Sequence, residues 1–213
     1  MRALLFLLAA TTAVMASAPA TPERQRPLPP ARIGMLEGPD RDEWQQPDRV
    51  MDELLIAEGD RVADVGAGGG WFTIRLAHRV GPNGVVFAQD IQPAMLASIR
   101  RRVGREGLTN VQTILGTPED PNLEDSLRAV LMVDVYPSLV DPVPMLRRVA
   151  ASLAPNGRIG IVDFKTDGAG GPGPEVSERV DADAIKRNAF EAGLVLIKEE
   201  SFLRYQYFLV FGR

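Results

Sequence analysis

A glycine-rich turn between a short apolar run and a helix-like segment constrains this chain more than any other feature. Residues 61–73 read Arg-Val-Ala-Asp-Val-Gly-Ala-Gly-Gly-Gly-Trp-Phe-Thr. The first apolar residues suit a buried parallel strand, and those after the glycines recur at helical spacing up to Val80. Glycines at such a turn let a ligand approach the backbone, and a helix start presents free amide groups. The turn therefore predicts an α/β fold with a ligand at the end of this strand.

The spacing of these glycines separates two classes of ligand. The dinucleotide motif Gly-x-Gly-x-x-Gly needs a glycine where this chain has Trp71. The chain instead reads Asp-x-Gly-x-Gly-x-Gly from Asp64, which resembles the first motif of class I S-adenosylmethionine-dependent methyltransferases. The resemblance implies that Asp64 helps to hold the ammonium group of the cofactor, because a carboxylate lowers the energy of a nearby cation. It also implies contacts to the amino-acid end of S-adenosylmethionine by Gly66, Ala67, Gly68 and Gly70. A tight turn without a ligand is the structural alternative.

An acid follows the second predicted strand, residues 85–88, about twenty residues after the glycine turn. In nucleotide-binding α/β folds, an acid at this place accepts hydrogen bonds from ribose hydroxyls. Asp90 and the neighbouring Ile91 are therefore predicted to contact the cofactor. Pro93 then begins a helix.

The loop after the third predicted strand, residues 111–115, reads Gly-Thr-Pro-Glu-Asp. In the family that the chain resembles, this loop holds the adenine, usually through an acid directly after the glycine. Thr117 stands at that position, so Glu119 and Asp120 are the alternatives for an acidic contact.

The end of the fourth predicted strand, residues 129–133, supplies the candidate catalytic residues. The resemblance implies that this strand end faces the transferred methyl group. Asp134 and Tyr136 could accept a hydrogen bond from the ligand or orient a nucleophile, and Asp134 is also predicted to contact the cofactor. A packing role for Tyr136 is the alternative. Relatives of this kind often carry histidines where this chain has Pro137 and Ser138.

The whole pattern predicts a Rossmann-like seven-stranded, mostly parallel sheet with helices on both faces and an antiparallel last strand. Helices are expected over residues 48–56, 143–153 and 176–192, with Gly193 ending the last one. Residues 194–197 and 205–211 are expected to form the closing hairpin. The glycine-rich stretch 166–174 is either a substrate lid or a tolerated insertion.

The amino terminus resembles a secretory signal, with a basic start, an apolar region and small residues over residues 1–20. Cleavage is expected at residues 18–20 or 14–16, and an uncleaved membrane tether is the alternative. Residues 21–47 read as a proline-rich linker of extended chain, and residues 48–213 as the methyltransferase-like domain. Trp44 either covers a ligand pocket or packs on the outside of the domain. Export, periplasmic or secreted, would separate the protein from cytoplasmic S-adenosylmethionine.

Composition narrows the chemistry of the 213 residues. The net charge of −4 and the lack of a long basic run give no electrostatic footprint for nucleic acid. The chain has no cysteine and one histidine, His78, so no thiolate site or histidine cluster for a metal is expected. The resemblance implies methyl transfer from S-adenosylmethionine to a small-molecule acceptor, and this reaction requires no metal. Two alternatives are a nicotinamide-dependent oxidoreductase and an exported, non-catalytic binding module.

Overall fold

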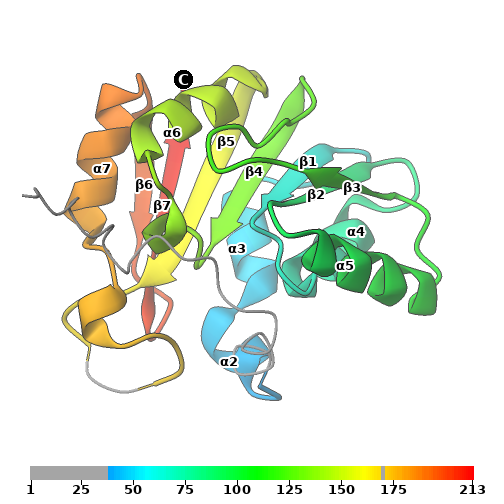
Figure 1. Cartoon of the computed structure of the whole chain (residues 1–213), viewed down its shortest axis with the longest axis horizontal. Coiled ribbons are helices and arrows are strands. Elements are labelled where there is room, and N and C mark those ends of the chain that lie inside the picture. The colour runs from blue at the N-terminus through cyan, green and yellow to red at the C-terminus, as the bar shows by residue number, and fades with distance from the viewer. Residues whose placement is uncertain (1–37, 169–170) are drawn as a thin grey trace, which may run out of the picture.

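A central β-sheet organises the protein in the computed structural model, which describes residues 38–168 and 171–213 (Figure 1). In this described part the sheet has seven strands in the order β3-β2-β1-β4-β5-β7-β6. The strands are β1 Arg61–Val65, β2 Val85–Asp90, β3 Val111–Leu115, β4 Leu127–Val133, β5 Leu153–Phe164, β6 Val195–Glu200 and β7 Gln206–Gly212. All neighbours pair in parallel except those of β7, which is antiparallel to both β5 and β6. The predicted fold class is therefore confirmed.

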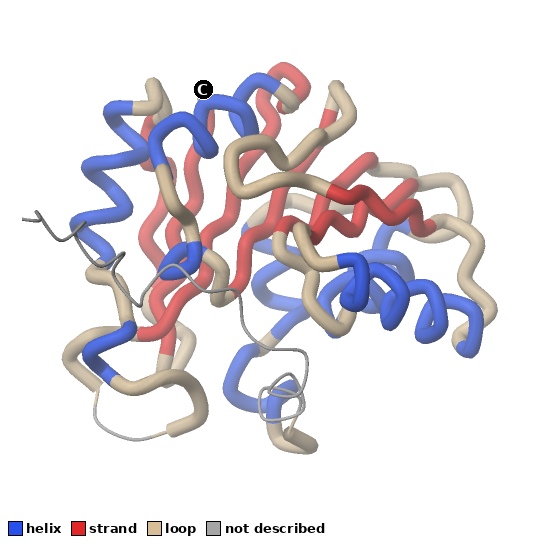
Figure 2. Tube along the Cα trace, in the orientation of Figure 1, coloured by secondary structure: helices blue, strands red, loops and turns tan. Residues whose placement is uncertain are grey.

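Helices cover both faces of the sheet (Figure 2). Their bounds are α2 Arg41–Gln45, α3 Pro47–Glu53, α4 Trp71–Val80, α5 Pro93–Arg105, α6 Pro142–Ala151 and α7 Ala182–Glu191, with short 3-10 turns η3 Tyr136–Ser138 and η4 Val176–Glu178. One apolar cluster joins α6 and α7 to one face, and another joins α3 and α4 to the other face. Strand β4 shows why both faces need cover: Val130 and Met132 enter the first cluster, whereas Ala129 and Leu131 enter the second.

Several local signals in the sequence act as predicted. Pro93 lies in the first turn of α5, where its missing amide hydrogen removes no helical bond. Gly81 ends α4 at φ 64°, and Gly193 follows α7 at φ 86°. Strand β5 begins at Leu153, which pairs with Leu127 of β4, and the register then shifts so that Arg158 pairs with Ala129.

The helix predicted over residues 176–192 begins only at Ala182, so this prediction is wrong for its first six residues. Asp181 caps the helix, its Oδ1 accepting from the Asp183 amide at 2.8 Å. The preceding Arg179 is buried, and its guanidinium donates to the carbonyl oxygens of Pro174, Lys165 and Gly168 at 2.9 to 3.0 Å. These bonds fix a loop where the apolar pattern alone suggested a helix.

Extended chain up to Pro47 is also contradicted, because residues 41–45 form α2. Only 7% of the surface of Trp44 is exposed, and its ring contacts the rings of Phe164 and Tyr205 with centroids 6.1 Å away in each case. A helix of this length gains little from helix propensity. Burial of the tryptophan stabilises it instead.

The predicted signal segment, and the predicted linker up to residue 37, lie outside the described residues. Among the helices that are described, none combines the length and the apolar character needed to cross a membrane.

Candidate functional site

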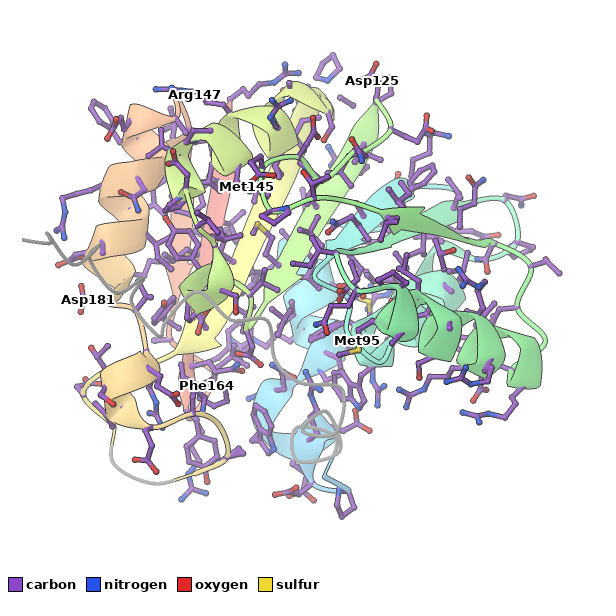
Figure 3. The ribbon with its side chains drawn as sticks, in the orientation of Figure 1. Met95, Asp125, Met145, Arg147, Phe164 and Asp181 are labelled. Atoms are coloured by element: carbon purple, nitrogen blue, oxygen red, sulfur yellow. The ribbon has the colours of Figure 1, made fainter. Side chains whose placement is uncertain are left out.

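A cavity of about 220 Å³, partly open to solvent, lies at the carboxyl ends of β1, β2 and β4. The glycine turn, the start of α5, the loop after β3, η3 and α2 also contribute to its wall. Met95 from α5 and Met145 from α6 line it from different elements, as Figure 3 lets the reader follow. Ligand sites of open α/β sheets occupy this position, because the strand-to-helix loops converge there.

The glycine turn forms one wall of the cavity. The wall there consists largely of main-chain atoms, because a side chain at Gly66 would clash with its neighbour. Gly66 has φ 68°, and a Cβ atom there would lie 2.3 Å from the Val135 side chain. Gly68 and Gly70 also have positive φ, and Gly70 precedes the first turn of α4. Gly66, Ala67 and Gly68 line the cavity, whereas Gly70 acts from behind by setting the helix start. The wall is thus shaped to admit a ligand close to the main chain.

Asp90 joins the end of β2 to this turn. Its Oδ2 accepts from the Gly68 amide at 3.0 Å, and its Oδ1 accepts from the Gln92 amide at 2.9 Å. Burial raises the pKa of the Asp90 carboxyl above its ordinary value. Asp90 and Ile91 both line the cavity. Each carboxylate oxygen keeps a further lone pair for a ligand hydroxyl.

Asp64 lies at the end of β1 and is almost fully buried. Its Oδ2 accepts from the Thr73 hydroxyl at 2.6 Å. Burial raises the pKa of the carboxyl to about 6, against the opposing effects of the Thr73 bond and of the positive charge on Arg41. Asp64 lines the cavity and therefore offers its charge to a cationic ligand.

The loop after β3 places Thr117, not the neighbouring acids, in the cavity wall. The Thr117 hydroxyl accepts from the amides of Glu119 and Asp120 at 3.3 and 3.0 Å, so it stabilises its own turn. The Asp120 carboxylate pairs with Arg148 at 2.6 Å, outside the cavity lining. Glu119 is exposed and is also absent from the lining.

The two predicted catalytic residues are placed differently. Asp134 lines the cavity with φ 57°, a left-handed conformation that is uncommon outside glycine but that aspartate adopts more readily than most residues. Tyr136 is buried in the apolar cluster beneath α6, and its hydroxyl accepts from Asn188 Nδ2 at 2.8 Å. Burial raises the pKa of Tyr136 to about 12. The structure therefore places Tyr136 in the core and not in the cavity wall.

Arg41 of α2 is a cavity residue that the sequence reasoning missed. It is 7% exposed, and its guanidinium carbon lies 4.1 Å from the centroid of Trp71. Helix α2 also reaches α4 through Asp42, whose Oδ1 pairs with Arg75 at 2.5 Å. The aromatic and charged run around Trp44 was the only signal of this contact in the sequence, and it did not indicate Arg41.

The glycine-rich stretch 166–174 contributes no described residue to the cavity lining. A Cβ atom on Gly171 or Gly173 would lie 2.5 or 2.6 Å from the rings of Tyr205 and Phe164, respectively. These glycines allow the loop to pack on the aromatic residues beside Trp44. No group of three or more potential metal ligands occurs within residues 38–168 and 171–213.

Comparison with known proteins identifies the segment that contains most of this cavity. Residues 62–157 match the family model of a methyltransferase domain. These residues are similar to a methyltransferase domain. A S-adenosylmethionine-dependent methyltransferase from Aquifex aeolicus has the same fold, with a TM-score of 0.81 and 25% identity over 86% of this chain and 98% of that one.

Curated relatives agree with this identification. An uncharacterized methyltransferase of Mycobacterium tuberculosis is 39% identical over 118 residues, or 54% of this chain and 44% of the relative. Nocamycin O-methyltransferase of Saccharothrix syringae is 32% identical over 114 residues, or 53% of this chain and 41% of the relative. Relatives named for arsenite and tRNA also match. The matches span less than half the length of these relatives.

S-adenosylmethionine is the cofactor that the methyltransferase domain and its structural neighbour imply. The residues present fit it. The glycine turn leaves room beside the backbone, Asp64 and Asp90 bring carboxyl groups to the cavity, and Arg41 brings a guanidinium group. An amino-acid group with both an ammonium and a carboxylate, attached to a ribose, matches this set of charges.

Proposed function

We propose that the protein transfers a methyl group from S-adenosylmethionine to a small-molecule acceptor. The convergence of the glycine turn, Asp64 and Asp90 on one cavity carries this proposal. The cavity is bordered by Arg41 of α2 and by apolar residues that follow η3 and lie in α6, which favours a compact acceptor over a long polymer. Small-molecule methyltransferases among the relatives support the same acceptor class.

Bound S-adenosylmethionine supplies a methyl group that is already activated by a sulfonium. The protein then has to bind, align and exclude water. In this proposal Asp64 attracts the ammonium group, Arg41 the carboxylate, and Asp90 the ribose hydroxyls; all three residues line the cavity. Asp134 lies on the same cavity, at the end of the neighbouring strand β4. This division assigns cofactor binding chiefly to β1 and β2 and acceptor chemistry to β4.

The test is a calorimetric titration of the purified chain with S-adenosylmethionine, S-adenosylhomocysteine and reduced nicotinamide cofactor. Micromolar binding of the first two ligands, without binding of the third, is the expected result. Binding of the nicotinamide cofactor alone would replace this proposal with an oxidoreductase. A folded chain that binds none of the three would contradict cofactor binding, and would favour the non-catalytic binding module.

We also propose that the protein is exported, from the basic, apolar and small-residue pattern of residues 1–20. A fusion of residues 1–30 to a reporter that is active only outside the cytoplasm tests this. An inactive fusion that is well expressed would contradict export. Retention of the active fusion in the membrane fraction would favour the tethered alternative.

A further inference from the structure

Two buried carboxyl oxygens beside the cavity have no hydrogen-bond donor: Oδ2 of Asp134 and Oδ2 of Asp163. These aspartates follow β4 and end β5 at equivalent places, because Val133 pairs with Val162 in the parallel register. The Asp134 amide donates to the Val162 carbonyl at 2.9 Å, which holds the two strand ends together. Buried polar atoms are rarely left without a partner, so this arrangement needs an explanation.

The other oxygen of Asp134 ends a chain of buried side chains. Arg41 Nε donates to Gln45 Oε1 at 2.5 Å, Gln45 Nε2 to Gln206 Oε1 at 2.9 Å, and Gln206 Nε2 to Asp134 Oδ1 at 2.6 Å. A guanidinium group can only donate, so Arg41 fixes the orientation of both amides. Asp134 Oδ1 is consequently an acceptor in this chain. A proton on Asp134 therefore belongs on Oδ2.

Asp163 also uses one of its carboxylate oxygens as a hydrogen-bond acceptor. Its Oδ1 accepts from the Phe164 amide at 2.9 Å, and its side chain is 1% exposed. Each aspartate thus uses Oδ1 as an acceptor and has Oδ2 left without a donor. One proton held between the two carboxyl groups would satisfy both Oδ2 atoms, which two ionised carboxylates could not do.

The electrostatics agree with this geometry. Burial raises the pKa of Asp134 to about 6, opposed by Arg41 and by the Gln206 bond. Burial and then the charge of Asp134 raise the pKa of Asp163 well above its ordinary value, opposed by the Phe164 amide, by the Tyr136 backbone and by Arg179. Tyr207 of β7 also faces the two aspartates, and its own pKa is raised by burial and by their charges. Both directions favour one shared proton over two ionised carboxylates.

We propose that Asp134 and Asp163 form a proton-sharing pair, oriented by Arg41, Gln45 and Gln206, that takes the proton lost by the methyl acceptor. This inference rests on the proposed methyl transfer and assigns the acceptor to compounds with an ionisable O–H or N–H group. The O–H or N–H proton passes to the Asp134 carboxylate, and the released electron pair forms the bond to the methyl carbon. The carbon–sulfur bond breaks with its electrons remaining on sulfur, which leaves a neutral thioether. The extra proton then leaves the pair for solvent.

The first test measures the titration of the Asp134 carboxyl group by carbon-13 NMR in the full chain, with Asp134→Asn identifying its signal. Asp163→Asn should lower the pKa of Asp134 by about 1 unit, because it replaces a carboxyl group by a neutral amide donor. Gln206→Leu should raise that pKa by about 1 unit, because the ionised carboxylate loses a hydrogen bond. Gln45→Leu should raise it less, because Gln45 acts through Gln206.

Gln46→Asn is the matched control for the amide chain. Gln46 adjoins Gln45, but its amide donates to the Phe202 carbonyl at 3.1 Å and takes no part in the chain. The pKa of Asp134 should not change in this variant. If the pKa of Asp134 is unchanged in both Asp163→Asn and Gln206→Leu, and both variants are folded, the proposed proton-sharing pair is wrong. If Asp163→Asn fails to fold, an unchanged pKa in folded Gln206→Leu alone overturns the positioning role of the chain.

The second test follows labelled methyl transfer from S-adenosylmethionine to a panel of phenols, alcohols and primary amines. The rate of methyl transfer should increase as the pH rises through the pKa of Asp134. In Gln206→Leu the same increase should occur at higher pH. A pH profile that does not move would contradict the base role. If the chain binds S-adenosylmethionine but methylates no member of the panel, the assigned acceptor class is wrong. If it does not bind the cofactor, the proposed function fails, while the NMR titration still decides whether the pair exists.

Discussion

The two sides of the cavity are built by different means. The cofactor side lies at the carboxyl ends of β1 to β3. It consists of the glycine turn and of Asp90, whose carboxylate accepts hydrogen bonds from the backbone amides of Gly68 and Gln92. On the acceptor side, the ends of β4 and β5 with α2 and the start of β7, buried side chains make the contacts. Asp134 and Gln206 are 72 residues apart in sequence, and Gln45 and Gln206 are 161 apart. Backbone fixes one side, and long-range side-chain contacts fix the other.

This difference implies that the cofactor side is sensitive to changes in backbone conformation, whereas the acceptor side is sensitive to changes in polar side chains. Four experiments test the two sides and the contacts around them, beginning with the largest expected effect.

Gly66→Ala should lower the free energy of unfolding by roughly 3 kcal/mol, since strain and overpacking add. Its Cβ atom would lie 2.3 Å from Val135 at φ 68°. Gly107→Ala is the matched control, because Gly107 has φ 66° but no atom within 4 Å of the added Cβ. It should cost about 1 kcal/mol from backbone strain alone. Urea unfolding measures both, and equal losses would show that close packing against Val135 is not what shapes the turn.

Asp64 should make stability fall as pH rises. Its folded-state pKa is raised from 3.8 to about 6, so the folded chain holds a proton that the unfolded chain releases between these values. The stabilisation is present below pH 3.8 and is lost as pH approaches 6. Asp64→Asn keeps an acceptor for the Thr73 hydroxyl and should avoid roughly 3 kcal/mol of this loss. The free energy of unfolding of the original chain and of Asp64→Asn, measured at pH 4 and pH 8, tests this prediction. If the two proteins differ in stability by the same amount at both pH values, the prediction is wrong.

Asp90→Ala should weaken S-adenosylmethionine binding by about 1 to 3 kcal/mol, if its carboxylate is bonded to the ribose. Part of this loss comes from the Gly68 amide, which also loses its acceptor. Glu119→Ala should leave the affinity unchanged, because Glu119 is exposed and does not line the cavity. Calorimetry distinguishes the two variants. Unchanged affinity in Asp90→Ala would remove the ribose assignment.

Asp42→Asn should have the smallest effect, below about 1 kcal/mol of unfolding free energy. Its ion pair with Arg75 joins α2 to α4 at 2.5 Å, but 62% of the Asp42 side chain is exposed. Buried contacts of Trp44 and Gln45 should hold α2 without it. Thermal unfolding at low and high salt measures the contribution. A loss of several kcal/mol would mean that the surface pair is what fixes α2.

The same contrast explains what the sequence could predict. The glycine turn, Asp90 and the Pro93 helix start depend on residues close together in the chain, and the structure places them as expected, with Asp90 on the cavity. Helix α2 was missed because its stability comes from Trp44 packing on Phe164, 120 residues later, and not from local propensity. Tyr136 was considered for catalysis, yet its burial depends on α6 and α7. The amide chain leaves no local pattern at all, because Gln45 and Gln206 meet only in the folded sheet.

Strand β7 runs opposite to its neighbours, so its first residue, Gln206, lies at the same edge of the sheet as the end of β4. This direction has a consequence for the order of events during synthesis. All residues of β1 to β3 have been made by Leu115, before any residue of β4, β5 or β7. The Asp134 carboxylate lacks its side-chain donor until the ribosome has added Gln206. Translation of the carboxyl-terminal hairpin therefore completes the acceptor side, and a nascent chain that stops before it carries Asp134 without the amide that orients its carboxylate.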